Sequence, residues 1–257
     1  MGRVIFLGTG DPLNWERAQS SLAVPLAGDE VMLIDASSGT VLLGQLEAAG
    51  IPLQNVRYLF VSHAHFDHVG GLAPLLVGMT PHQESSLTVH AMPGTLEALR
   101  ELLALTIPGV ESWLGERLAW RELALGEAVS VNGAEIIPFG VDHTLGCVGF
   151  RVILEGSSMV YAADTRPCPE VVENARGTEL LIHEAYGSAK GAEMAHALGH
   201  SSASEAGEVA RAAGAKRLVL THFRASHFAD LEELADEAAA AFGGPVDAAH
   251  DLDVFDF

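Results

Sequence analysis

The stretch Ser62-His63-Ala64-His65-Phe66-Asp67-His68 carries the strongest chemical signature in this sequence. It places three histidines and one aspartate within six residues, more metal-binding capacity than a core or surface segment needs. Imidazole suits zinc, iron, nickel or copper, and a carboxylate without a nearby thiolate favours a catalytic site over a structural one. We therefore expect a dinuclear metal site here.

The residues around this stretch place it in the fold. Arg57 to Val61 is a short β-branched and aromatic run with turn signals before it at Gly50 and Pro52, which predicts a buried strand. The candidate ligands then lie on a loop at the carboxyl end of that strand, and residues 69–72 turn into a helix. Open α/β sheets bind their ligands at this end.

The motif His63-Ala64-His65-Phe66-Asp67-His68 resembles the H-x-H-x-D-H signature of the metallo-β-lactamase superfamily. Three later segments resemble further motifs of that superfamily, in the same order: Val141-Asp142-His143-Thr144, Ala162-Ala163-Asp164-Thr165 and Leu220-Thr221-His222-Phe223. The resemblance implies an α/β protein with the four-layer αββα fold, in the order helix, sheet, sheet, helix. It also implies a metal-dependent hydrolase.

A narrower resemblance points to the ribonuclease Z branch of the superfamily. The segments that carry it are Leu7-Gly8-Thr9-Gly10, Leu33-Ile34-Asp35-Ala36, His183-Glu184-Ala185, the run from Gly199 to Gly207, and Thr221-His222-Phe223. We expect Asp35 to support the metal loop and not to bind metal.

The superfamily resemblance implies a ligand set for two divalent ions. One ion would be held by His63, His65 and His143, the other by Asp67, His68 and His222, with Asp164 bridging both. Each distant ligand taken alone is more typical of a structural residue, but three strand ends that each deliver a metal-type ligand favour a joint site. We expect zinc, with manganese or iron as alternatives. A metal-bound hydroxide would be the nucleophile, oriented and deprotonated by Asp67.

A second catalytic group follows from the ribonuclease Z resemblance. It implies that Glu184 orients His200, which contacts the scissile phosphate and helps the leaving oxygen depart. An imidazole backed by a carboxylate is a suitable proton donor near neutral pH. The alternative is a structural role for His200 beside the start of a helix, and we expect His183 to lie behind the site.

Composition agrees with one enzyme domain over residues 1–257. About half of the residues are apolar, and no apolar run reaches the length of about 20 residues that crosses a membrane. The run from Val4 to Leu7 is too short for a signal-peptide core, and Cys147 and Cys168 imply no disulfide framework. We expect a cytoplasmic protein.

Charge and chain length argue against a nucleic-acid substrate. The net charge is −20, and the 14 lysines and arginines are scattered, whereas nucleic-acid binding depends on such cations. Many ribonuclease Z proteins carry a basic tRNA-binding arm between the ligands that correspond to His143 and Asp164. Here residues 144–163 suffice only for two strands and their turn. We therefore expect a small anionic substrate.

Hydrophobic patterning predicts two similar halves. Expected strands cover residues 4–7, 22–26, 31–35, 58–61, 136–139, 150–154, 159–162 and 180–183, and expected helices cover 40–48, 72–76, 202–213 and 231–242. Residues 93–120, with leucines at helical spacing, form either a helix over the first sheet or a lid on the pocket. The apolar stretch from Leu75 to Met79 is either core or the interface of the homodimer that we expect by resemblance.

These observations favour a dinuclear metal-dependent phosphodiesterase that acts on a small anionic ester. The alternatives within the fold are a tRNA 3′-processing endoribonuclease, that is ribonuclease Z, or a lactone, thioester or arylsulfate hydrolase. An iron oxidoreductase and a metal-storing interaction protein are disfavoured because all seven ligands are present. Whether Arg224, His227 or His250 line the pocket stays open.

Overall fold

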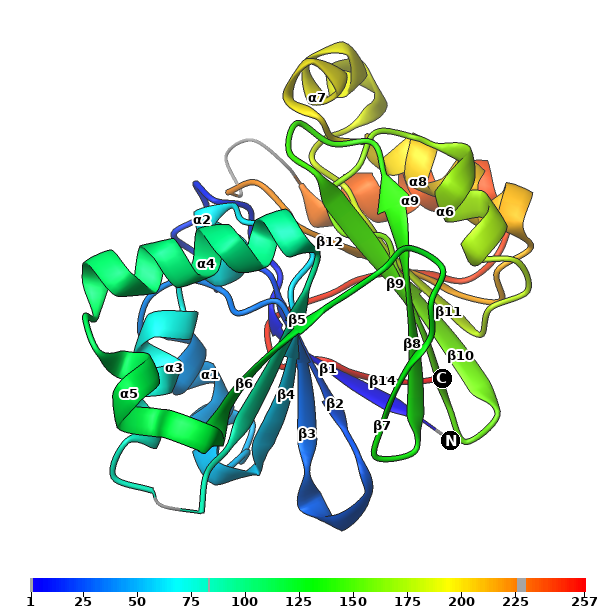
Figure 1. Ribbon diagram of the computed structural model, residues 1–257. Helices are drawn as coiled ribbons and strands as arrows, with labels where there is room; N and C mark the ends of the chain where they lie inside the picture. The colour runs from blue at the N-terminus through cyan, green and yellow to red at the C-terminus, as the bar shows by residue number, and fades with distance from the viewer. Residues whose placement is uncertain (1, 83, 226–229) are drawn as a thin grey trace.

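Two β-sheets lie face to face, with helices on their outer sides. The computed structural model describes residues 2–82, 84–225 and 230–257, and Figure 1 shows the two sheets meeting in the middle of the molecule. Their strand orders are β14-β1-β2-β3-β4-β5-β6 and β13-β12-β11-β10-β9-β8-β7. The expected αββα layering is confirmed.

The first sheet is antiparallel on one side and parallel on the other. Its strands are β1 Arg3–Gly8, β2 Ser21–Pro25, β3 Val31–Ile34, β4 Val56–Phe60, β5 Leu87–Ala91, β6 Leu118–Glu122 and β14 Val254–Asp256. Pairing is antiparallel from β14 to β3 and parallel from β3 to β6. The helices in this half are α1 Val41–Ala48, α2 Phe66–Val69, α3 Leu72–Met79, α4 Pro93–Thr106 and α5 Val110–Leu114.

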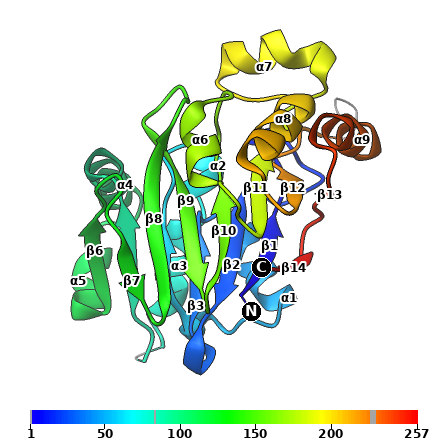
Figure 2. The ribbon, with the colours of Figure 1, turned by 90° about the vertical axis from the view of Figure 1, so that its right-hand side faces the viewer.

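The second sheet repeats this plan. Its strands are β7 Val129–Val131, β8 Ala134–Val141, β9 Cys147–Leu154, β10 Ser157–Tyr161, β11 Leu180–Glu184, β12 Leu218–Thr221 and β13 Val246–Ala248. Pairing is antiparallel from β7 to β10 and parallel from β10 to β13. Helices α6 Pro169–Asn174, α8 Ala203–Ala213 and α9 Leu231–Phe242 cover it, and α7 Ala192–Leu198 projects beyond the layers (Figure 2).

Strand β3 shows why both faces of a sheet are apolar here. Met32 and Ile34 pack in the core between the sheets, whereas Val31 and Leu33 pack against the helices of the first half. Successive side chains of a strand point to opposite faces, so a strand covered on both sides reads as a continuous apolar run. This explains why β3 and β4 were predictable from short apolar runs.

Two segments had two alternative roles in the sequence analysis, residues 93–120 and the stretch from Leu75 to Met79. Both contribute buried side chains to the core of the first half. Helix α4 buries Leu96, Leu99 and Leu103, while Leu105 is 83% exposed. It packs over β5 and β6, as the helix alternative expected, but the end of the 93–120 segment is strand β6. In α3, Leu75, Leu76 and Met79 are fully buried, so this stretch is core.

Helix α8 begins and ends as its sequence predicts. The Ser202 side chain accepts a hydrogen bond from the Glu205 backbone, and Glu205 returns the contact in a capping box. Gly214 follows the last turn with φ of 63°, a left-handed conformation that suits glycine. Among the residues described, none of the helices combines the length and the apolar character needed to cross a membrane.

His90 in β5 is buried, with its side chain 5% exposed. Neither ring nitrogen has a hydrogen-bond partner among the described residues, and the ring stacks on Phe60 with centroids 4.4 Å apart. Burial, with a smaller effect from the Arg121 charge, lowers the pKa of His90 to about 4. The unfolded chain, in which histidine titrates near pH 6.5, therefore takes up a proton before the folded chain does.

Replacing His90 with leucine should therefore weaken the loss of stability at low pH. Since the unfolded state gains the proton first as pH falls, His90 costs the wild type about 2 kcal/mol of stability between pH 7 and pH 5. Urea unfolding of both proteins at these two pH values measures the effect. Equal losses in wild type and H90L would contradict the prediction.

Candidate metal centre

The candidate ligands follow the carboxyl ends of four strands from the two sheets. Residues 63–68 follow β4, His143 follows β8, Asp164 follows β10 and His222 follows β12. Asp35, Ala163 and His222 adopt left-handed backbone conformations, with φ between 54° and 59°. Each lies just after a strand, at the point where the chain turns into the site. This conformation costs a non-glycine residue about 1 kcal/mol of strain energy, and three such residues lie together at the site.

One group of ligand atoms consists of His63, His65, His143 and Asp164. These atoms all lie within 4.8 Å of one another. The Nδ1 atom of His65 lies 2.9 Å from His63 Nε2 and 3.2 Å from His143 Nε2. The Oδ2 atom of Asp164 lies 3.7 Å from His63 Nε2. Three imidazole nitrogens and one carboxylate oxygen therefore converge on one point.

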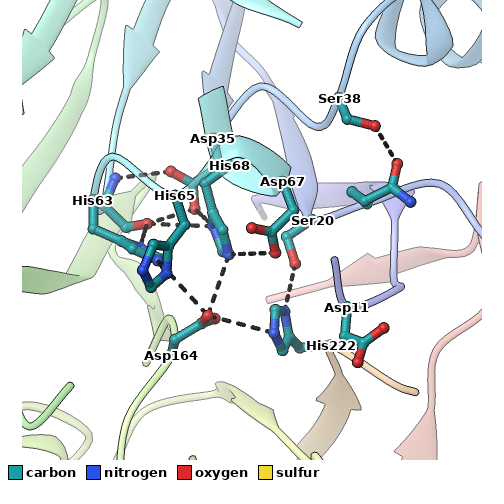
Figure 3. Close-up of polar contacts among 12 residues, drawn as sticks. Asp11, Ser20, Asp35, Ser38, His63, His65, Asp67, His68, Asp164 and His222 are labelled. Atoms are coloured by element: carbon teal, nitrogen blue, oxygen red, sulfur yellow. Dashed lines mark hydrogen bonds and ion pairs between the residues drawn. The ribbon is translucent and has the colours of Figure 1, made fainter. Parts of the chain in front are cut away.

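A second group consists of Asp67, His68, Asp164 and His222, again within 4.8 Å. Asp164 Oδ2 lies 3.3 Å from His68 Nε2 and 3.4 Å from His222 Nε2, as the dashed lines of Figure 3 show. Asp67 Oδ2 lies 3.3 Å from His68 Nε2. Asp164 is thus shared by both groups, in the position that a bridging carboxylate requires.

The chemistry of these residues fits divalent cations. Four buried ligand atoms of the second group have no hydrogen-bond partner among the described residues: Asp67 Oδ2, His68 Nε2, Asp164 Oδ1 and His222 Nε2. Buried polar atoms nearly always form a hydrogen bond, so four such atoms without one at a single point indicate a site for a cation that they would share. Nitrogen and oxygen donors of this kind suit zinc, manganese and iron.

Further residues hold the histidines in orientation. Asp35 accepts a hydrogen bond from the Ser62 backbone at 2.8 Å, and its Oδ2 lies 2.8 Å from His68 Nδ1. His222 Nδ1 lies 3.0 Å from Ser20 Oγ, and His143 Nδ1 donates to the Gly199 carbonyl at 2.8 Å. Such contacts fix the ring and leave Nε2 for a metal. Asp35 therefore supports the metal loop, as expected.

The pKa shifts of several ligands also favour their metal-binding forms. His68 is the exception: although burial lowers its pKa, the Asp164, Asp67 and Asp35 charges outweigh burial and hold the pKa well above the ordinary value. Burial holds the pKa of His63, and less strongly that of His65 and His143, below the ordinary value for histidine. Burial would raise the pKa of Asp164, but the His222 and His68 charges outweigh it and hold the value well below normal. Neutral imidazole and ionised carboxylate are the metal-binding forms of these side chains.

His200 and Glu184 lie beside both ligand groups. The Nδ1 atom of His200 lies 2.9 Å from Glu184 Oε1, and its ring centroid lies 5.1 Å from that of His143 and 5.3 Å from that of His222. Burial would lower the pKa of His200, but the charge and hydrogen bond of Glu184 raise it to about 9. The Tyr186 ring stacks on His200 at 4.4 Å.

The structure also places two of the three residues whose position at the pocket the sequence left open, Arg224 and His250. The Arg224 guanidinium lies 5.0 Å from the Tyr186 ring centroid, close to His200, whereas the His250 side chain is exposed and lies 3.7 Å from Asp253. His250 joins neither ligand group, and His227 lies outside the described residues.

Asp11 belongs to the turn from Gly8 to Pro12, which was expected to end a strand and was left open as a lining of the site. It is fully buried, its backbone N–H donates to Phe223 O, and its Oδ2 atom has no hydrogen-bond partner among the described residues. Figure 3 shows its side chain beside His222. The sequence signal was only the turn from Gly8 to Pro12 after the first strand.

Residues 31–223 match the family model described as "Beta-lactamase superfamily domain". The chain belongs to the metallo-β-lactamase superfamily. It is a hydrolase of the ribonuclease Z-like branch, since the ribonuclease Z of Methanothermobacter thermautotrophicus (strain Delta H) is 31% identical over 300 residues. That alignment covers 98% of this chain and 95% of the relative. Because it is longer than the 257 residues of this chain, the relative contains segments that are missing here.

Solved structures support the same fold. The metallo-beta-lactamase fold protein YhfI from Bacillus subtilis superposes with a TM-score of 0.85 at 23% identity, covering 99% of this chain and 98% of that protein. A diphosphatase from the PhnP family superposes with a TM-score of 0.79 at 20% identity, covering 100% and 98%. At these identities the likeness shows the fold alone.

Replacing Asp164 with asparagine should reduce metal binding below two ions per chain, because the shared carboxylate belongs to both groups. Metal content after zinc loading and dialysis, measured by mass spectrometry, gives the result. Asp142→Asn removes the same charge from an exposed position close to the site and should keep two ions. Two tightly held ions in D164N would contradict a bridging role.

Asp35→Asn should weaken metal binding without removing a ligand. The amide cannot match the carboxylate that faces His68 and Ser62, and loss of such orienting contacts typically costs 10–100-fold in metal affinity, which we expect here at about 30-fold. Competition with a chelating dye measures the affinity. An unchanged affinity in folded D35N would show that the contact does not position His68.

Proposed function

We propose that this chain is a dinuclear metal-dependent phosphodiesterase, with zinc as its native metal and manganese or iron as alternatives. The observation that supports this most is the pair of ligand groups sharing Asp164, with the Glu184-bound His200 at their border. Acid–base side chains beside a site for two cations suit in-line cleavage of an anionic ester.

The chain's own residues divide the work. His63, His65 and His143 would hold one ion, Asp67, His68 and His222 the other, and Asp164 both. Such ions, when bound, supply Lewis-acid charge and lower the pKa of water so that it becomes a nucleophile near neutral pH. Asp67 orients the attacking water and accepts its proton through a carboxylate oxygen that has no hydrogen-bond partner among the described residues.

His200 acts on the leaving group, to whose oxygen it donates a proton. A cleaved phosphodiester leaves an alkoxide that needs a proton, and His200 is placed to supply it. Glu184 fixes the ring through Nδ1 and is itself fixed, because the Thr165 and Ser201 backbones donate to its two oxygens at 2.7 and 3.2 Å. This chain of contacts holds the donor beside the ligands before substrate arrives.

Cleavage of tRNA precursors is the second candidate. The relatives named ribonuclease Z favour it, and they give no support to our expectation that a nucleic-acid substrate is disfavoured. Two observations favour a small substrate: the net charge of −20, and the interval between His143 and Asp164. That interval holds only β9 and β10, joined by the two-residue turn Glu155-Gly156, and leaves no arm to grip an RNA.

Two accompanying proposals concern the whole protein. By resemblance we propose a homodimer, and a reducing cytoplasmic location in which the buried thiols of Cys147 and Cys168 stay free. Light scattering of the purified protein measures its oligomeric state. A monomer at micromolar concentration would reject the homodimer.

Hydrolysis of bis(p-nitrophenyl) phosphate by the zinc- and manganese-loaded protein tests the chemistry. Asp67→Ala and His200→Ala should each lower kcat by about 100-fold or more, since each removes a general acid or base. His250→Ala, a histidine at the exposed surface, is the matched control and should keep the wild-type rate.

A precursor tRNA with a 3′ trailer serves as the competing substrate. A higher kcat/KM on the RNA than on small diesters would favour the ribonuclease Z function. No turnover of either substrate with two ions bound would reject phosphodiester chemistry and favour lactone, thioester or sulfate ester hydrolysis.

A further inference from the structure

An apolar cavity of about 500 Å³ adjoins the metal-ligand loop. Its walls come from three places: Ala64 in that loop, the start of α4, and the end of β8 with its connection to β9 and the first residues of β9. The residues of the last two places are Met92, Gly94, Thr95, Ala98, Gly140, Leu145, Gly146, Cys147 and Val148. Leu125 closes a further side. The volume suits a small organic group.

The cavity lies next to residues that carry the candidate ligands. Ala64 separates His63 from His65 in the chain, and Leu145 and Gly146 follow His143 closely. Cys147 also lines the cavity, and its thiol lies 3.5 Å from Nδ1 of His63, behind the nitrogen that faces the other ligands. A substrate bound at the ligands would therefore extend its second ester group toward this cavity.

The cavity walls exclude several kinds of group. Among the residues that the structure describes, the lining contains no Asp, Glu, Lys, Arg or His that would neutralise a second phosphate. The described part of the lining contains no Phe, Tyr or Trp either, and nucleobases bind in single-stranded RNA sites largely by stacking on such rings. Leu125 and Leu145 are 54% and 44% exposed, so an apolar occupant would cover them.

We propose that this cavity binds an uncharged apolar ester group, so that the preferred substrate is a small phosphodiester with one alkyl or simple aromatic substituent. The inference rests on the proposed phosphodiesterase function and names its substrate class. Each methylene that leaves water in the cavity improves binding about fourfold. Selectivity should therefore rise with the size of the group that is not cleaved off.

A series of p-nitrophenyl phosphodiesters with one common leaving group tests this directly. The second ester group is methyl, butyl, hexyl or phenyl, so only the part in the cavity changes. We expect kcat/KM of the zinc-loaded enzyme to rise at least about 30-fold from methyl to hexyl. Equal values across the series, with clear turnover, would overturn the cavity proposal and leave the phosphodiesterase function standing.

Ala98→Trp fills the cavity from an exposed position of helix α4. It should lower the hexyl-to-methyl ratio of kcat/KM at least about tenfold. Gly146→Leu fills it from another wall, where an added Cβ meets no atom within 4 Å and the backbone is unstrained. Leu105→Trp adds the same ring to an exposed position of α4 outside the lining and should keep the ratio. An unchanged ratio in both filled variants would overturn the proposal.

Binding of hexylphosphonate and methylphosphonate, measured by calorimetry, does not depend on turnover. Tighter binding of the hexyl compound, reduced in A98W and kept in L105W, would support the cavity even if no diester were hydrolysed. Equal affinities for the two phosphonates would reject it. The outcome thus separates failure of the cavity from failure of the proposed reaction.

Discussion

The Asp164 carboxylate is the point on which the site depends. One buried oxygen of this residue lies between 3.3 and 4.0 Å from Nε2 atoms of four histidines: His63, His68, His143 and His222. These residues follow strands of both sheets, so the sheets must bring the carboxyl ends of those strands to one edge. Burial of an anion without positive partners is costly, so the carboxylate requires the cluster around it.

Asp35 links this cluster to the core of the first sheet. It follows β3, and its two oxygens face the Ser62 backbone, the Ser62 hydroxyl, His68 and the Tyr161 hydroxyl. Tyr161 belongs to the second sheet, so this carboxylate also bridges the two sheets. The position of the candidate ligand His68 and the packing of the two sheets are therefore coupled through Asp35.

The sequence predicts those parts of the fold and of the site whose residues lie close together in the chain. Residues 63–68 are clustered in the chain, and the α8 cap and the α9 helix have complete start and stop signals. It missed β5, whose apolar run is interrupted by the buried His90, and the short edge strands β13 and β14, which exist only because a distant strand pairs with them. The contacts of His222 with Ser20 and of His143 with Gly199 join distant segments and leave no local pattern.

The candidate ligands and the cavity walls come largely from different parts of this chain. The ligand residues lie at strand ends that the whole fold determines. The cavity walls come from the start of α4, from the connection between β8 and β9, and from the strand residues Gly140, Cys147 and Val148. Only the part of the lining that lies in loops can vary without disturbing the sheets. Among the described residues the lining has no charged side chain, so the strongly acidic chain offers an apolar surface beside the candidate metal centre. On the proposed function, the part of this lining that lies in loops would therefore set which ester group the chain accepts.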